Sequence, residues 1–523
     1  MQSVSPSQIE RETPTVLGAA DLDRSLVKGI AWTSTVTWFS QILSWGSTLV
    51  VVHYLVPGDY GLIGMALLYL GFAQLASELG VGSAIVQFHR LTGDQLRQFN
   101  SLSVIAGVLC VLVSLLAAVP LGYFFREPRL PLVIVVMSAN FVISAFKVVP
   151  QALLERQLRF RKLAVFEGTK SILAATSTLM MAMRGFGYWT LALGPLIGAT
   201  VYVILVITQN PIGFRRPRLA TIREPFTFSS HMLVSRFAWY GFSNADFAVI
   251  SKALGGTALG AYTIGWTLSG MAVEKITALV GRVTPAFFSA VQNDLVALRR
   301  YLLLITEGLA LVTFPVCIGL ALIAEDIVHS AMGARWTPAI VPMQLLAIAA
   351  TFRSIQPLIP QVLVALRESR RNMNNTLLTV IVLPLGFYGA SRWGINAVAL
   401  TWLILYPLLA SPLFGRTFRM LDLPIRTYVA SLWPATSACL VMAAVVTLLD
   451  QTVLTTEPTY VSLLIKVFLG AAVYAGSLLL FHRQRILELR SLLRLLRSGK
   501  APEVAAQRDT TKTEPSLQPV GAV

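Results

Sequence analysis

The sequence predicts an all-α protein that crosses a membrane many times. Of its 523 residues, 55% are hydrophobic and only 13% are charged, and the mean hydropathy is +0.68. Soluble domains contain about 25% charged residues, so a chain this apolar would expose far too much hydrocarbon to water. The apolar residues form long continuous runs without two-residue alternation. Such runs predict helices rather than the strands of a membrane barrel.

The number of spans follows from the length of these runs. A bilayer core about 30 Å thick is crossed by about 20 apolar residues of helix. Fourteen runs fit this length: 29–52, 60–80, 101–125, 131–150, 165–183, 187–209, 227–251, 258–281, 301–324, 337–366, 374–391, 394–414, 428–448 and 461–481. The sequence therefore predicts about 14 transmembrane helices.

The distribution of Lys and Arg predicts the orientation. The connections after even-numbered runs contain 19 of these residues, and the connections after odd-numbered runs contain 6. Basic residues near span ends stay on the cytoplasmic side, so both termini are predicted to be cytoplasmic. The net charge of +17 thus reflects topology and attraction to anionic membrane lipids. We expect no nucleic acid as a partner.

The chain also contains an internal repeat. Residues 148–162 return at 358–372, an offset of 210, and 29–67 align with 228–266 at an offset of 199. A third pair, RGFGYWTLAL at 184 and SRWGINAVAL at 391, is offset by 207. Three anchors in the same order predict two lobes of six spans each. Because six is even, both lobes enter the membrane from the same side, as parallel repeats do.

The repeat and the spans together predict a domain organisation. It consists of a cytoplasmic N-terminal tail (1–23), an N-lobe (24–210), a cytoplasmic linker (211–226), a C-lobe (227–420), spans 13 and 14 (421–481), a basic amphipathic helix (482–498) and a disordered tail (499–523). The three cysteines, Cys110, Cys317 and Cys439, all lie in apolar runs without metal-ligand spacing. They are predicted to behave as small buried hydrophobes.

Four stretches carry a resemblance to a known family. They are LVPGDYGLIGMA (55–66), ELGVGSAIVQFHRLTGDQL (78–96), PQALLERQLRFRKLAV (150–165) and NADFAVISKALGGTALGAY (244–262). Their order and spacing resemble the polysaccharide-exporting branch of the multidrug/oligosaccharidyl-lipid/polysaccharide (MOP) superfamily, in particular flippases of the Wzx type. The resemblance implies a two-lobed helical fold in the bacterial inner membrane.

The resemblance also implies a function and partners. It implies flipping of undecaprenyl-diphosphate-linked oligosaccharide for lipopolysaccharide or exopolysaccharide biosynthesis, by alternating access through a cationic cavity. A polysaccharide polymerase and glycosyltransferases are the partner enzymes to expect. Coupling to H⁺ or Na⁺ stays open, and no cofactor is expected.

A diphosphate-linked substrate needs cations within the membrane, where charges are costly and usually functional. Arg236 and Arg353 lie near the middle of the seventh and tenth runs. Each is predicted either to line the cavity or to cap helix carbonyls, and the guanidinium fork suits phosphate. Lys147 and Lys170 lie within about two turns of a cytoplasmic end. They either bind substrate or extend to the interface.

Acidic and polar residues complete the candidate site. Asp246, Glu78 and Glu274 are candidates for coupling or gating, with structural ion pairing as the alternative for Asp246. In the first run, a polar stripe at three- and four-residue spacing includes Thr37, Gln41 and Ser44. These side chains either line the cavity or bond to the backbone and a neighbouring helix.

Three other functions compete with a flippase. An enzyme is disfavoured because the sequence contains no catalytic arrangement, no nucleotide-binding motif and no outer loop longer than roughly a dozen residues. A drug or cation antiporter of the same superfamily is the main rival, but its pocket would favour acids and aromatic residues in the N-lobe. A scaffold without transport activity would not need arginines inside the membrane. The five histidines, His53, His89, His231, His329 and His482, are scattered and predict no metal site.

Overall fold

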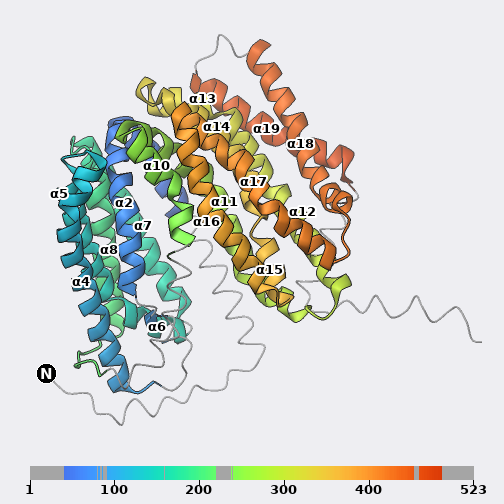
Figure 1. Ribbon diagram of the computed structural model, residues 1–523. Coiled ribbons are helices and arrows are strands. Elements are labelled where there is room, and N and C mark those ends of the chain that lie inside the picture. The colour runs from blue at the N-terminus through green and yellow to red at the C-terminus, as the bar shows by residue number, and fades with distance from the viewer. Residues whose placement is uncertain are drawn as a thin grey trace, which may run out of the picture. The chain divides into compact units, whose positions relative to one another are not determined.

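A computed structural model describes residues 40–78, 81–82, 85, 91–157, 159–218, 237, 239–452, 459–483 and 485. Helices joined by turns and short loops make up this part of the chain, and it contains no strand (Figure 1). The predicted all-α class is confirmed. The predicted N-terminal tail (1–23) and disordered tail (499–523) lie outside the described residues, as does most of the predicted amphipathic helix at 482–498.

The described residues fall into two compact units. The first consists of Met1–Met271, Ile323–Ala349 and Arg370–Pro412, and the second of Ala272–Leu322, Ala350–Ser369 and Leu413–Val523. These units reflect the density of packing contacts, whereas the predicted lobes 24–210 and 227–420 reflect the sequence repeat. The lobe boundaries therefore stay a prediction.

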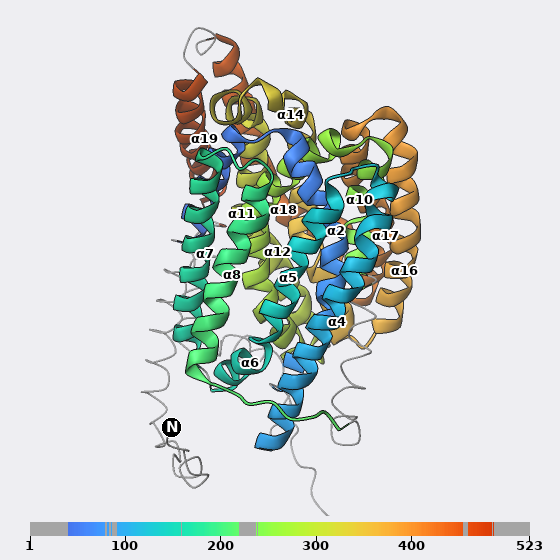
Figure 2. The ribbon, with the colours of Figure 1, turned by 90° about the vertical axis from the view of Figure 1, so that its left-hand side faces the viewer.

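The first unit contains most of the helices before residue 254. They are α2 (Pro57–Glu78), α4 (Gly93–Phe125), α5 (Leu130–Ala145), α6 (Val148–Arg156), α7 (Phe160–Met183), α8 (Trp189–Gln209) and α10 (Ala245–Ala253). α4, α5, α7 and α8 lie side by side, and α2 packs on α4 and α5 (Figures 1 and 2). Leu62 of α2 and Phe141 of α5 are almost completely buried in one core. This core holds together two of the helices that line the candidate site.

The second unit is built around α12 (Leu295–Leu322), α18 (Ile425–Thr452) and α19 (Thr459–Phe481), with α15 (Leu358–Ala365) beside α12. The Lys466 ammonium lies 2.5 Å from the Asp450 carboxylate, which ties α19 to α18. The remaining elements are α11 (Gly256–Ala290), α13 (Ala324–Ile327), η2 (Val328–Met332), η3 (Ala334–Ala339), α14 (Ile340–Ile355), α16 (Ser369–Ala390), η4 (Ser391–Trp393) and α17 (Ile395–Met420). Four of them, α11, α14, α16 and α17, have residues in both units.

The helices agree with the predicted spans in position. Each of the 14 predicted runs contains helix among its described residues. Of the described helices, nine are long and apolar enough to cross a membrane, and ten if α5 and α6 form one bent span. A multispan helical protein is therefore confirmed, while the count of 14 stays a prediction.

The repeat at 148 and 358 has a local structural counterpart. α5 and α6 are separated by residues 146–147, with a bend of 43°, and α14 and α15 by residues 356–357, which lie 210 positions later. Pro150 and Pro360 occupy the third position of the following helix. Proline has no N–H to donate, and its ring clashes with the carbonyl four residues earlier. Both copies of the motif therefore interrupt the helix at the same place.

The repeat at 184 and 391 is also visible in the backbone. Gly187 before α8 has a φ of 55°, and Gly394 before α17 has a φ of 90°. Both values lie in the left-handed region, which glycine adopts without the steric cost that other residues meet. The two glycines, 207 positions apart, therefore make corresponding turns into corresponding helices.

A reciprocal contact joins the beginnings of α2 and α11 within the first unit. A methyl group added at Gly61 would lie 1.8 Å from the Gly256 carbonyl oxygen, and one added at Gly260 would lie 1.7 Å from the Pro57 carbonyl oxygen. Pro57 and Gly256 are the first residues of the two helices and are 199 positions apart, as are Gly61 and Gly260. Each contact is thus the repeat mate of the other. Reciprocity of this kind is what a two-fold axis between parallel repeats produces.

This helix crossing predicts a matched pair of destabilising substitutions. We expect Gly61→Ala and Gly260→Ala each to lower the melting temperature of the detergent-solubilised protein, because each methyl meets backbone that cannot rotate away. Overpacking of this kind costs about 1–3 kcal/mol. The control is Gly58→Ala, one turn earlier, where the nearest atom to an added methyl is 4.0 Å away. Equal melting temperatures for all three variants would contradict the reciprocal crossing.

Candidate functional site

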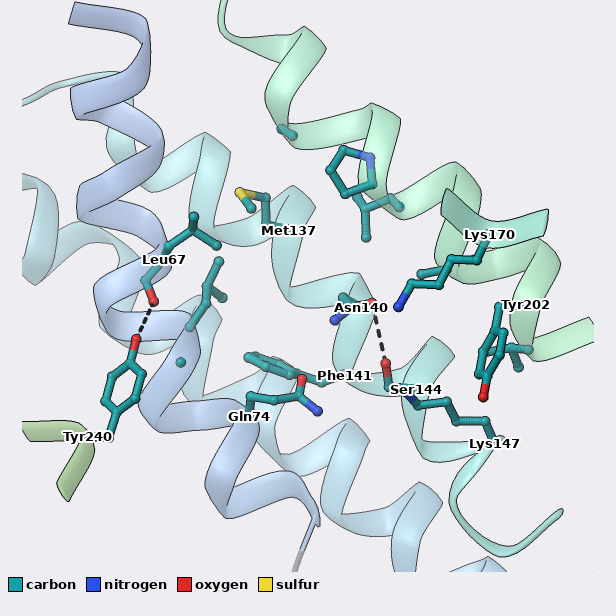
Figure 3. Close-up of a pocket in the computed structure, with 17 residues that line it drawn as sticks. Leu67, Gln74, Met137, Asn140, Phe141, Ser144, Lys147, Lys170, Tyr202 and Tyr240 are labelled. Carbon is teal, nitrogen blue, oxygen red and sulfur yellow. Dashed lines mark hydrogen bonds between the residues drawn. The ribbon is translucent and has the colours of Figure 1, made fainter. Parts of the chain in front are cut away.

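A pocket of about 450 Å³ lies inside the first unit, among α2, α5, α7 and α8 (Figure 3). Its volume is within the range of about 300–1,000 Å³ that is usual for ligand sites. The lining residues are Leu67, Leu70, Gly71, Gln74, Met137, Asn140, Phe141, Ser144, Lys147, Lys170, Ala192, Pro195, Leu196, Ala199, Tyr202, Val203 and Tyr240. The charged residues in this lining are Lys147 and Lys170. The pocket is therefore an apolar cavity with a cationic end.

Two lysines from different parts of the chain approach the same aromatic ring. The Lys147 ammonium lies 5.5 Å from the centre of the Tyr202 ring, and the Lys170 ammonium lies 5.6 Å from it. Both distances are within the range of cation–π attraction, and Figure 3 shows Lys147, Lys170 and Tyr202 at the same end of the pocket. An anion in the pocket would be attracted by both ammonium groups.

Local sequence explains how these side chains reach one place. Lys147 lies in the break between α5 and α6 that the Pro150 ring causes. From this break it lines the pocket. On α8, Gly198 lets α7 come close: a methyl there would lie 2.6 Å from the Lys170 carbonyl oxygen. Tyr202 follows one turn after Gly198 on the same helix. Close packing at Gly198 therefore places Lys170 of α7 next to the turn of α8 that carries Tyr202.

Polar groups line the rest of the cavity. The Ser144 hydroxyl donates to the Asn140 side-chain oxygen at 3.4 Å, one turn along α5. The Tyr240 hydroxyl donates to the Leu67 carbonyl at 3.1 Å and packs over Gly71, where a methyl would lie 1.9 Å from the phenol oxygen (Figure 3). Amide and hydroxyl groups of this kind can bond to hydroxyl-rich ligands.

Of the cationic residues predicted for the cavity, the structure brings Lys147 and Lys170 together. Arg353 lies in the last turn of α14, half-buried, in the second unit. Arg236 lies outside the described residues, as does Thr37. A cavity role for the two arginines thus stays a prediction.

The other polar candidates do not line this pocket. Gln41 and Ser44 are half-buried in the helical segment 40–54, where the Ser44 carbonyl accepts a bond from Thr48 at 2.9 Å. Ser47 donates to the Ala175 carbonyl at 3.0 Å, which attaches this segment to α7. At least part of the predicted polar stripe therefore bonds to backbone, one of the two alternatives that the sequence left open.

The three acidic candidates lie in different environments. Glu274 is exposed on the part of α11 that belongs to the second unit. Glu78 ends α2, and its side chain lies outside the described residues. Asp246 is fully buried in the first unit. The acids are thus not gathered at the lysine pocket.

Asp246 forms a hydrogen-bonded cluster that joins three helices. One carboxylate oxygen accepts from the Tyr262 hydroxyl at 2.6 Å and from the Trp402 indole N–H at 2.8 Å. The other accepts from the backbone N–H of Phe247 at 2.9 Å. A buried carboxylate needs such donors. Asp246 therefore connects α10, α11 and α17.

Sequence reasoning missed Tyr202, Gln74 and Tyr240, which come from helices far apart in the chain. No local signal marks them, because single polar residues in apolar helices are common. Asn140 and Ser144 did leave a signal. With Lys147 they occur at steps of four and three residues, the spacing of one helix face.

The described residues contain no group of three or more His, Cys, Asp or Glu side chains that could hold a metal ion. Fold and pocket thus define a multispan helical membrane protein with a cationic pocket. The family of polysaccharide biosynthesis proteins matches residues 33–341, more than half of the chain. The chain belongs to this family.

Known proteins resemble the chain in sequence and in fold. It is 23% identical over 434 residues to the lipopolysaccharide biosynthesis protein WzxC of Escherichia coli (strain K12), which covers 79% of this chain and 85% of that protein. The lipid II flippase MurJ in an inward closed conformation has a TM-score of 0.67 at 14% identity, covering 87% of this chain and 99% of that one. An inward-facing multidrug resistance MATE transporter of the MOP superfamily has a TM-score of 0.58 at 16% identity, covering 73% and 94%. These likenesses confirm the predicted MOP fold.

The Asp246 cluster predicts non-additive losses of stability. Asp246→Ala removes the acceptor of two side-chain hydrogen bonds, and each lost bond in a buried site costs about 1–3 kcal/mol. In the Asp246→Ala background, Tyr262→Phe should cost much less than it does in the wild-type protein, because the bond that it removes is already absent. Melting temperatures of the two single variants and the double variant test this. Additive losses would contradict the shared bond.

Proposed function

We propose that this chain moves a polyprenyl-diphosphate-linked oligosaccharide from the inner to the outer leaflet of the bacterial inner membrane. The observation that carries the proposal is the convergence of Lys147 and Lys170 on Tyr202 in an internal pocket. Membership of the polysaccharide biosynthesis family supports it. So does the relative WzxC, whose name connects it with lipopolysaccharide biosynthesis.

The pocket suits the diphosphate end of such a lipid. Phosphate oxygens would form charge-assisted hydrogen bonds with the two ammonium groups. Asn140, Ser144 and Gln74 offer amide and hydroxyl groups to the first sugar. At about 450 Å³, the cavity would hold the charged end of the substrate and leave the lipid tail in the bilayer.

The position of the pocket relative to the α2–α11 crossing supports a proposal of alternating access. On α2, the crossing residue Gly61 and the pocket residue Gln74 are 13 positions apart, about 20 Å along a helix. The Lys and Arg distribution assigns the start of α2 to the outer side. We infer that the crossing closes the outer end of the substrate path while the lysine pocket is accessible from the cytoplasmic side. Both termini are cytoplasmic in this arrangement.

A drug or cation antiporter is the competing function. The MATE neighbour supports it only through the fold, which both classes share. The charge of the pocket favours the flippase, because its charged lining residues are lysines. A cationic drug would be repelled there, and a diphosphate would be attracted.

Substitution of Lys147 and Lys170 tests the proposal through the rate of flipping. In a bacterium that lacks this chain, lipid-linked oligosaccharide should accumulate in the inner leaflet, and the wild-type chain should relieve the accumulation. Lys147→Gln and Lys170→Gln should each slow flipping about tenfold or more, because a hydrogen bond to a charged group contributes about 1.5–3 kcal/mol. Export of surface polymer and the leaflet distribution of the labelled lipid are the measurements.

The matched control is Lys162→Gln. Lys162 is exposed at the start of α7, where its ammonium donates to the Gln209 side chain at 2.6 Å, and it does not line the pocket. This variant should flip at the wild-type rate. Normal flipping by the double variant Lys147→Gln/Lys170→Gln would refute the pocket, and normal polymer output without the chain would refute the flippase. Arg236→Ala and Arg353→Ala, tested in the same way, decide whether the predicted second-lobe arginines take part.

We further propose that transport is coupled to H⁺ or Na⁺ through acidic side chains, of which Asp246 is the leading candidate. A cation bound at this carboxylate would change its hydrogen bonds to Tyr262 on α11 and Trp402 on α17. α11 also carries the crossing at Gly260, so such a change would act on the helix that closes the outer end. Glu78 and Glu274 are secondary candidates. Glycosyltransferases would supply the substrate, and a polysaccharide polymerase would consume it after flipping.

Coupling predicts a loss of gradient dependence. In proteoliposomes, Asp246→Asn should flip substrate at a rate that no longer responds to an imposed proton or sodium gradient. The wild-type protein should respond to one of the two. An unchanged response in the Asn variant would remove Asp246 from the coupling mechanism.

A further inference from the structure

The segment that follows α8 is held on the surface of α4. It consists of residues 211–218, PIGFRRPR, and we call it the basic strap. The strap has no regular secondary structure, yet its backbone is fixed at several points. The sequence predicts only a linker between the two lobes here. The contacts of the strap are more specific than a linker needs.

Three polar side chains of α4 hold the strap backbone. The Asn100 amide donates to the carbonyls of Ile212 at 3.2 Å and Gly213 at 3.4 Å. The Ser101 hydroxyl accepts from the Arg215 N–H at 2.9 Å, and the Gln98 side-chain oxygen accepts from the Arg218 N–H, also at 2.9 Å. All three anchoring residues are buried. Buried polar groups are costly unless bonded, so the sequence here specifies one strap conformation.

Apolar contacts hold the same segment from its other side. Ile212 packs against the small core around Phe99 and Val149. The Phe214 ring meets the Phe146 ring edge-on, with centroids 6.2 Å apart, and remains mostly exposed. An exposed aromatic ring next to arginines is the pattern of a segment at a membrane–water interface.

The length of α4 gives the depth of the strap. α4 has 33 residues and is therefore about 50 Å long, whereas a bilayer core is about 30 Å thick. The apolar run predicted to cross the core is 101–125, so residues 93–100 extend beyond it on the side assigned to the cytoplasm. The strap is attached at residues 98–101 of α4. It therefore lies at the level of the lipid headgroups.

The strap presents arginines at that level. Arg215 pairs with Asp94 in the first turn of α4, which adds to the anchoring. Arg216 and Arg218 are exposed, and Arg97 of α4, also exposed, lies beside Gly213. Within the part of the chain that the structure describes, these three arginines form no ion pair. Their charge is available to an anion.

We propose that the basic strap is a docking site for the phosphate groups of anionic phospholipids in the cytoplasmic leaflet. The guanidinium fork matches phosphate oxygens, and the anchored backbone means that little conformational entropy is lost on binding. The depth of the strap and the exposed Phe214 favour a lipid over a soluble phosphate. The site is separate from the lysine pocket and goes beyond the proposed flipping activity.

The test measures lipid preference in the full-length protein. The wild-type chain is reconstituted in nanodiscs that contain phosphatidylglycerol and phosphatidylcholine, and the retained lipids are counted by native mass spectrometry. The wild-type protein should retain phosphatidylglycerol selectively. Arg216→Gln/Arg218→Gln should reduce this preference about thirtyfold, which corresponds to about 1 kcal/mol for each arginine near an anionic surface. High salt should weaken the wild-type preference.

Two further variants separate the built site from simple charge attraction. Arg184→Gln/Arg392→Gln removes the same charge from exposed positions in loops assigned to the outer side, and it should leave the preference unchanged. Gln98→Leu/Asn100→Leu keeps every arginine but removes two anchors, and it should lose most of the preference. Wild-type preference in the anchor variant or in Arg216→Gln/Arg218→Gln would overturn the proposal. In the Lys147→Gln/Lys170→Gln background, which removes the charge of the lysine pocket, selective retention of an isoprenoid diphosphate over phosphatidylglycerol would overturn it as well.

Discussion

The cost of positive charge inside an apolar helical unit is the constraint on which the candidate site depends. Lys147 and Lys170 approach one ring, that of Tyr202, from two different elements. An anion that enters the pocket would be attracted by both ammonium groups. The close packing of α7 on α8 at Gly198 fixes Lys170 in this position, so the helix packing and the charge of the pocket are parts of one arrangement.

Internal repetition shapes the helices around this site. The breaks before Pro150 and Pro360, the left-handed Gly187 and Gly394, and the mutual contact of Gly61 and Gly260 recur at the offsets found in the sequence. At this crossing the backbones of α2 and α11 touch at Gly61 and Gly260, and side chains such as Leu259 pack beside them. The buried Asp246 cluster binds α11 to its neighbours and adds a polar group to the same end.

Sequence predicted the fold better than it predicted the site. Continuous apolar runs and the Lys/Arg distribution depend on local composition, so the helices appear where they were expected. Lys147 and Lys170 were identified because lysine is rare within apolar runs. Their convergence was not predictable, because it depends on a tertiary contact between α7 and α8. Tyr202 has no local signature at all, and the anchoring of the basic strap by Gln98, Asn100 and Ser101 looks in sequence like an ordinary polar end of a helix.

Ligand binding to the purified protein shows which sign of charge the pocket accepts. Purified protein is titrated with an isoprenoid diphosphate sugar and, separately, with a lipophilic cation of similar size. The diphosphate should raise the melting temperature of the wild-type protein, the cation should not, and Lys147→Gln/Lys170→Gln should abolish the rise. Stabilisation by the cation, or a diphosphate effect that survives in the double variant, would contradict the account.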